Sequence, residues 1–135
     1  MTGSRAMPSI AVLLLLACGG DGDSPRCDDA GLPSACEDVP VPTYEALHRD
    51  VLRPSCGRDG PSCHGEGSRM PLSFVDVEAS RDALLEHYVV PGSLACSELF
   101  RRVTSDEPFV RMPPAEPLPE AARCAIARWI EASAP

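Results

Sequence analysis

The sequence lacks lysine. All 12 basic residues are arginines, and against 20 acidic residues they leave a formal net charge of -8. Such a chain has no basic surface for a phosphate backbone, which argues against binding to nucleic acid. The longest apolar run, Ile10 to Ala17, is far shorter than the roughly 20 residues that span a bilayer. We therefore expect no nucleic-acid partner and no membrane-crossing helix.

Large apolar side chains are also scarce. Between Thr43 and Pro135, only 20 of 93 residues are Leu, Ile, Val or Phe, which is close to the level typical of disorder. A small domain with so thin a core depends on disulfides, a metal or a buried cofactor. Seven cysteines could serve that need, and they indicate an oxidising compartment or a covalent cofactor.

The N-terminus has the pattern of an export signal. Arg5 precedes the apolar run, and Cys18 follows it directly. The end of this segment resembles a bacterial lipobox, which implies cleavage after residue 17 and lipidation of Cys18. An ordinary signal peptide with a stray cysteine is the other interpretation. Lipidation would anchor the protein outside the cytoplasm, in the periplasm or at the cell surface.

Residues 18–42 are predicted to be an acidic, flexible linker between the lipid and a single domain at 43–135. The segment is rich in Gly, Asp, Ser and Pro and nearly free of apolar residues. Cys27 and Cys36 lie inside it with eight residues between them. The simplest expectation is a local disulfide that closes this small loop.

Hydrophobic spacing in the domain predicts short helices joined by long loops, without a strand ladder. The fold class expected is therefore all-α. The predicted helices are Tyr44–Arg53 capped by Thr43 and ended by Pro54, a second helix capped by Asp76, a third from Ser93 to Val103, and a last one carrying Ala122, Ile126, Trp129 and Ile130.

Two short segments carry the candidate chemistry. Cys63-His64-Gly65 follows the first predicted helix, and Met112-Pro113-Pro114 lies 48 residues further on, just before the last helix. Their order resembles the class I cytochrome c family, and in particular small planctomycete-type cytochrome c domains of exported bacterial proteins. Other segments that share the resemblance are Leu52 to Cys56, Leu72-Ser73-Phe74, Val90 to Ser93, Leu99 to Val103, Leu118 and Ala127 to Ile130.

The resemblance implies haem c, with His64 as the proximal iron ligand, Met112 as the distal ligand and Cys63 as a thioether anchor. The sequence departs from the family at the first cysteine. Gly60 stands where that cysteine should be, and six residues instead of two separate Cys56 from Cys63. Three outcomes stay open: haem on Cys56 and Cys63, haem on Cys63 alone, or no haem and a Cys56–Cys63 disulfide.

The remaining candidates have less specific patterns. Cys96 and Cys124 are expected to bridge the third and last helices. Zinc on Cys56, Cys63 and His64 is a competing use, although the spacing lacks a short zinc knuckle. His48 and His87 are expected to be solvated, with His48 a remote alternative ligand. Met70 could replace Met112, Met112 could be core filler, and Trp129 is expected to be core.

Two functions follow from these readings. The first is a lipid-anchored, extracytoplasmic electron carrier that exchanges single electrons with a redox partner protein. The second is a haem-free, disulfide-bonded lipoprotein that acts as a structural or interaction module. No spacing typical of hydrolytic catalysis is present, so neither an enzyme nor a small-molecule substrate is expected.

Overall fold

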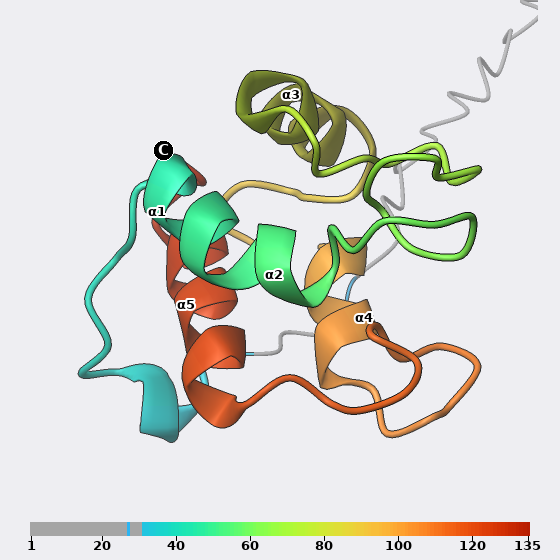
Figure 1. Cartoon of the computed structure of the whole chain (residues 1–135). Helices are drawn as coiled ribbons and strands as arrows, with labels where there is room; N and C mark the ends of the chain where they lie inside the picture. Colours follow the sequence, from blue (N-terminus) through green and yellow to red (C-terminus); the bar gives the residue numbers. More distant parts are fainter. Residues whose placement is uncertain (1–26, 28–30) are drawn as a thin grey trace, which may run out of the picture.

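The computed structural model describes Cys27 and residues 31–135. The predicted signal peptide and Cys18 lie outside the described residues. Within the described part of the chain the secondary structure is helical, without a strand (Figure 1). No helix there is long and apolar enough to cross a membrane.

The first helical segment runs from Tyr44 to Ser55 as three consecutive elements. These are α1 (Tyr44–Leu47), a π-helical turn η2 (His48–Leu52) and α2 (Arg53–Ser55). Thr43 caps the segment as predicted, since its Oγ1 accepts a hydrogen bond from the amide of Ala46 at 3.3 Å. The predicted stop at Pro54 is wrong by two residues, because proline is tolerated in the first turn of a helix and here lies at the start of α2.

Three further helices complete the domain. Asp76 caps α3 (Val77–His87) by accepting the amide of Ala79 at 2.8 Å, as predicted. The helix predicted from Ser93 begins later, as α4 (Glu98–Thr104). The buried Ser97 hydroxyl donates to the carbonyl of Ser93 at 2.6 Å and accepts from the amide of Val90 at 3.0 Å, which holds the preceding residues in a turn. The last helix is α5 (Glu120–Glu131).

The core lies between α5 and the first helical segment. Trp129, Ile126 and Ile130 of α5 are fully buried, and the ring of Trp129 lies 5.2 Å from that of Tyr44. Figure 1 shows α5 passing close to α1, with the loops that follow α2 and α4 both extending on the right of the view. Trp129 is therefore a core residue, as predicted.

Two disulfides join distant parts of the chain, and both differ from the expected pairings. Cys27 is bonded to Cys96, and Cys36 is bonded to Cys124. The local Cys27–Cys36 bridge and the Cys96–Cys124 bridge were wrong predictions. The Cys27–Cys36 bridge was expected because these two cysteines are close in the sequence. Packing of the N-terminal segment on the domain instead decides which cysteines pair.

The predicted linker is wrong for its second half. A 3-10 turn, η1 (Ser34–Cys36), carries the buried Cys36 to α5. Arg128 of α5 donates from Nε to the carbonyl of Val39 at 2.8 Å. Residues 31–42 therefore pack on the domain, because a disulfide and a side-chain hydrogen bond offset the small apolar content of this stretch.

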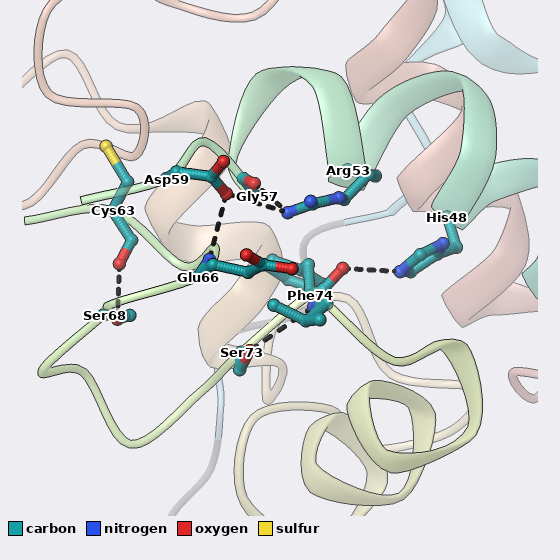
Figure 2. Close-up of polar contacts among 10 residues, drawn as sticks. His48, Arg53, Gly57, Asp59, Cys63, Glu66, Ser68, Ser73 and Phe74 are labelled. Carbon is teal, nitrogen blue, oxygen red and sulfur yellow. Dashed lines mark hydrogen bonds and ion pairs between the residues drawn. The ribbon is translucent and has the colours of Figure 1, made fainter. Parts of the chain in front are cut away.

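The residues between Cys56 and Cys63 form a loop that folds back on itself (Figure 2). Arg53 donates to the carbonyl of Gly57 and pairs with Asp59 at 3.7 Å. Asp59 in turn accepts the amide of Glu66 at 3.0 Å. The amide of His64 donates to the carbonyl of Cys56 at 3.0 Å. The extra residues thus bulge outward while Cys56 and His64 stay adjacent.

Gly65 packs tightly against the backbone of this loop. A Cβ atom at this position would lie 2.3 Å from the carbonyl oxygen of Arg58 and 2.4 Å from that of Gly57. Both contacts are with backbone atoms, which cannot rotate away as a side chain could. The bulge therefore depends on the absence of a side chain at Gly65.

We expect the Cys36–Cys124 bridge to be a major source of stability. It closes a loop of 88 residues, which corresponds to about 4 to 5 kcal/mol in the chain-entropy model. The double variant Cys36→Ser/Cys124→Ser should lose free energy of unfolding of this order in urea titrations. Cys63→Ser, at a free thiol, is the control and should change it by less than about 1 kcal/mol. Equal midpoints for the double variant and the wild type would contradict this account.

The loop geometry predicts that Gly65→Ala destabilises the protein by about 1 to 3 kcal/mol, the usual cost of forcing an extra group into a packed site. Gly31→Ala is a matched control, because nothing lies within 4 Å of a Cβ at Gly31. Urea unfolding of both variants tests the difference. Should the two alanine variants unfold at the same concentration, the close approach at Gly65 would carry no energetic weight.

Candidate functional site

A cavity of about 290 Å³ lies between the Cys56–Phe74 loop, α4 and the segment that carries Met112. Its walls are mainly apolar. Four predicted site residues, Cys56, Cys63, His64 and Met112, all line it. The other lining residues are Ser55, Ser62, Met70, Pro71, Leu72, Phe74, Leu84, Tyr88, Glu98, Leu99, Arg102, Val103, Pro113 and Pro114.

The His64 ring is held by backbone and aromatic contacts. Its Nδ1 lies 2.8 Å from the carbonyl oxygen of Leu72. Because a carbonyl can only accept, Nδ1 carries a proton, and in the neutral form of the ring the lone pair is then on Nε2. The edge of the ring meets Phe74, with 5.8 Å between the ring centroids. His64 is therefore arranged as a metal ligand would be, with one nitrogen anchored and the other open.

The two thiols at the cavity are free and half-buried. Burial and, to a smaller extent, the nearby Cys63 together raise the pKa of Cys56 to about 11. Cys56 is therefore a neutral thiol at physiological pH. The carbonyl of Cys63 accepts a hydrogen bond from the hydroxyl of Ser68 at 2.5 Å (Figure 2), which fixes the backbone from which its side chain projects.

Met112 enters the cavity from the loop between α4 and α5. Its amide donates to the carbonyl of Arg102 at 2.9 Å, so the loop is tied back to α4. Arg111 donates to the carbonyl of Pro114 at 3.2 Å across the same turn. Met70 lines the same cavity but is 40% exposed. Met112 is only partly exposed, so it is the more buried of the two thioethers.

The zinc alternative gains no support from the geometry. Among the residues that the structure describes, no group of three His, Cys, Asp or Glu side chains is placed to hold a metal ion. Cys56, Cys63 and His64 share a cavity without forming such a group. A haem site needs a different ligand set, in which a macrocycle and a thioether bind the metal together with one histidine, and these residues can contribute to such a site.

One histidine was wrongly predicted to be solvated. His48 is buried, and its Nε2 lies 2.9 Å from the carbonyl oxygen of Phe74. It does not line the cavity. His87 is exposed, as expected. The misjudgement arose because the polar residues Arg49 and Asp50 follow His48. The π-helical turn that begins at His48 cannot be recognised from hydrophobic spacing.

Sequence reasoning also missed an ion-pair group at the cavity. Glu98 pairs with Arg102 at 2.7 Å and with Arg101 at 2.6 Å. The pKa of Glu98 is lowered by its bonds to these two arginines, against the opposing effect of burial. Spacing of three and four residues on a helix signals such pairs, but α4 had to be placed before they could be assigned to the cavity wall.

The donor set matches the chemistry that haem c requires. Two thiols can form thioethers, an imidazole has Nε2 open, a thioether lies on another segment, and apolar side chains make up most of the walls. The residues present therefore fit the cofactor that the family resemblance implies.

The comparison with known proteins agrees with that resemblance. Residues 62–116 match the family model described as Planctomycete cytochrome C. The match includes Cys63, His64 and Met112 and begins after Cys56, so the unusual spacing lies at its edge. No curated protein and no solved structure matches the chain at a significant level. The predicted resemblance is confirmed over this segment: residues 62–116 are similar to the planctomycete-type cytochrome c family.

Proposed function

We propose that this protein is a lipid-anchored, extracytoplasmic electron carrier that holds one covalently attached haem c. The observation that carries the proposal is the convergence of Cys56, Cys63, His64 and Met112 on one apolar cavity. Cys56, Cys63 and His64 come from one loop, whereas Met112 comes from another segment, 48 residues after His64. Haem, when bound, would supply the one-electron centre.

Each residue has a distinct part in this proposal. The thiols of Cys63 and Cys56 would each add across one vinyl group, with no atom lost. The Nε2 of His64 would be the proximal ligand, kept in one tautomer by the hydrogen bond from Nδ1 to Leu72. Met112 would be the distal ligand, and methionine in that position raises the reduction potential.

The cavity walls would exclude water from the centre. Phe74 and Val103 are almost completely buried, at 1% each, and Leu99 is 8% exposed. An apolar surrounding disfavours the more highly charged oxidation state, so it acts in the same direction as the methionine ligand. An electron carrier needs no binding site for a substrate, and the family match favours this class over a conventional enzyme.

Charge suggests the kind of redox partner. The chain has 20 acidic and 12 basic residues, so a partner with a basic face would be steered toward it at low ionic strength. The anchor at Cys18 would keep the domain near a membrane, in the periplasm or at the cell surface, where haem attachment and disulfide formation both take place.

A haem-free module is the second candidate, and one observation favours it. The core around Trp129 is fully buried, and two disulfides join the N-terminal residues to the domain. Such a protein would serve as a structural or interaction module on the membrane surface. Cofactor content decides between the two candidates.

Production together with a bacterial haem-attachment system tests the proposal. We expect a red protein whose intact mass exceeds that of the mature polypeptide by one haem, and a pyridine haemochrome spectrum typical of thioether-bound haem. Cys63→Ser should abolish or sharply reduce attachment. Cys56→Ser should retain haem with one vinyl group unreacted, detectable in the haemochrome spectrum. A colourless product with no mass increase would favour the haem-free module.

The distal ligand is tested by Met112→Leu. We expect haem to stay attached and the reduction potential to fall by a sizeable part of the roughly 0.8 V range that axial ligands set, because the thioether is lost. Met70→Leu is the matched control, since Met70 lines the same cavity, and its potential should be unchanged. A fall in the Met70 variant alone would reverse the assignment of the two methionines.

Membrane anchoring is tested by Cys18→Ser in the full-length chain. Metabolic labelling with a fatty acid should mark the wild type and not the variant. The wild type should also sediment with membranes, whereas the variant should be soluble or retain its uncleaved leader. Equal labelling of both proteins would argue against lipidation at Cys18.

A further inference from the structure

His48 is a buried polar side chain to which the proposed function assigns no part. It begins the π-helical turn η2 and is only 9% exposed. Its ring lies between those of Tyr44 and Phe74, with centroid distances of 6.0 and 6.4 Å. A histidine so placed needs a hydrogen-bond partner, because an unpaired buried polar group is costly.

The partner of His48 is a backbone carbonyl. Nε2 lies 2.9 Å from the oxygen of Phe74, as Figure 2 shows. Since a carbonyl oxygen accepts, Nε2 must carry the proton and donate. The first helical segment is thereby joined to the stretch Leu72–Phe74, which lies 26 residues further along the chain.

The same stretch, Leu72–Phe74, is also hydrogen-bonded to His64. The carbonyl of Leu72 accepts Nδ1 of His64 at 2.8 Å, and the amide of Phe74 donates to the carbonyl of His64 at 2.6 Å. The ring of Phe74 meets the ring of His64 nearly edge-on, at an interplanar angle of 75°. Leu72–Phe74 therefore makes three contacts with His64 and two with His48.

We propose that His48 is a positioning residue for His64. Its hydrogen bond to the Phe74 carbonyl fixes the position of Leu72–Phe74 relative to the first helical segment. The Leu72 carbonyl is thereby placed to accept a hydrogen bond from Nδ1 of His64. The helix would thus set the tautomer and the ring orientation of the ligand without touching the cavity. The part that concerns His64 as a haem ligand rests on the proposed function, while the part that concerns its tautomer does not.

A packing role alone would make a different prediction. If His48 served only to fill space between Tyr44 and Phe74, an apolar side chain of similar size would replace it without effect on His64. If the hydrogen bond matters, only a side chain that can donate from the same position should replace it. Glutamine offers its side-chain nitrogen near the place of the histidine Nε2, whereas leucine offers no donor.

The first experiment uses the oxidised, haem-free protein and needs no variant. Long-range ¹H–¹⁵N correlation spectra of the histidine-labelled wild type report the tautomer of each ring. We expect the proton of His48 on Nε2 and that of His64 on Nδ1. A proton on Nδ1 of His48, with Nε2 unprotonated, would overturn the proposal directly.

The second experiment compares His48→Leu with His48→Gln in the same spectra. In the leucine variant we expect His64 to lose its single Nδ1-protonated form and show a mixture of tautomers, while the glutamine variant keeps the wild-type pattern. Urea unfolding verifies that both variants are folded. An unchanged His64 signal in a folded leucine variant would overturn the proposal, and if that variant does not fold, the wild-type tautomers decide.

With haem attached, the reduction potential gives an independent readout. A hydrogen bond from Nδ1 makes the imidazole a more basic ligand, which favours the oxidised state. The potential should therefore rise in His48→Leu and return to the wild-type value in His48→Gln. Equal potentials in all three proteins would contradict the proposal. If no variant, including the wild type, takes up haem, the proposed function fails while the tautomer test still judges His48.

Discussion

The rest of the structure depends on the covalent fastening of N-terminal segments to a domain that has few large apolar side chains. Cys36 and Cys124 are both almost completely buried, at 3% and 1%, and they join η1 to α5. The second bridge, between Cys27 and Cys96, ties the chain to the turn just before α4. Each bridge closes a long loop and so lowers the conformational entropy of the unfolded chain. Folding then costs less entropy, which compensates for the small amount of apolar surface that the core buries.

The candidate site is formed by loops and not by the helices that the disulfides join. The stretch from Cys56 to Phe74 has no regular secondary structure, yet short hydrogen bonds to its own backbone and to the first helical segment hold it. Arg53 and Asp59 support the bulge, Gly65 permits its close packing, and Leu72 orients His64. The site residues are thus positioned by loops, and hydrogen bonds to the disulfide-bonded helical domain hold these loops in place.

The unusual spacing of the two cysteines becomes intelligible in this setting. Six residues separate Cys56 from Cys63, but the bond between the His64 amide and the Cys56 carbonyl brings the ends of the loop together. The intervening residues form an outward excursion that Gly57 and Gly65 make possible: a Cβ at Gly57 would lie 2.9 Å from Arg53 atoms, and Gly65 is even more crowded. Insertions of this kind are tolerated when the loop ends keep their positions.

Much of the fold and of the candidate site was predictable from local pattern. The caps at Thr43 and Asp76 and the apolar spacing of Ile126, Trp129 and Ile130 mark helices because capping and periodicity are local properties. The motifs around His64 and Met112 likewise indicate the cytochrome c-like family through order and spacing. Disulfide pairing, the packing of residues 31–42, the burial of His48 and the shared cavity could not be read in this way. They depend on which distant segments meet in space, and that is decided by tertiary packing, not by the neighbours of each residue in the chain.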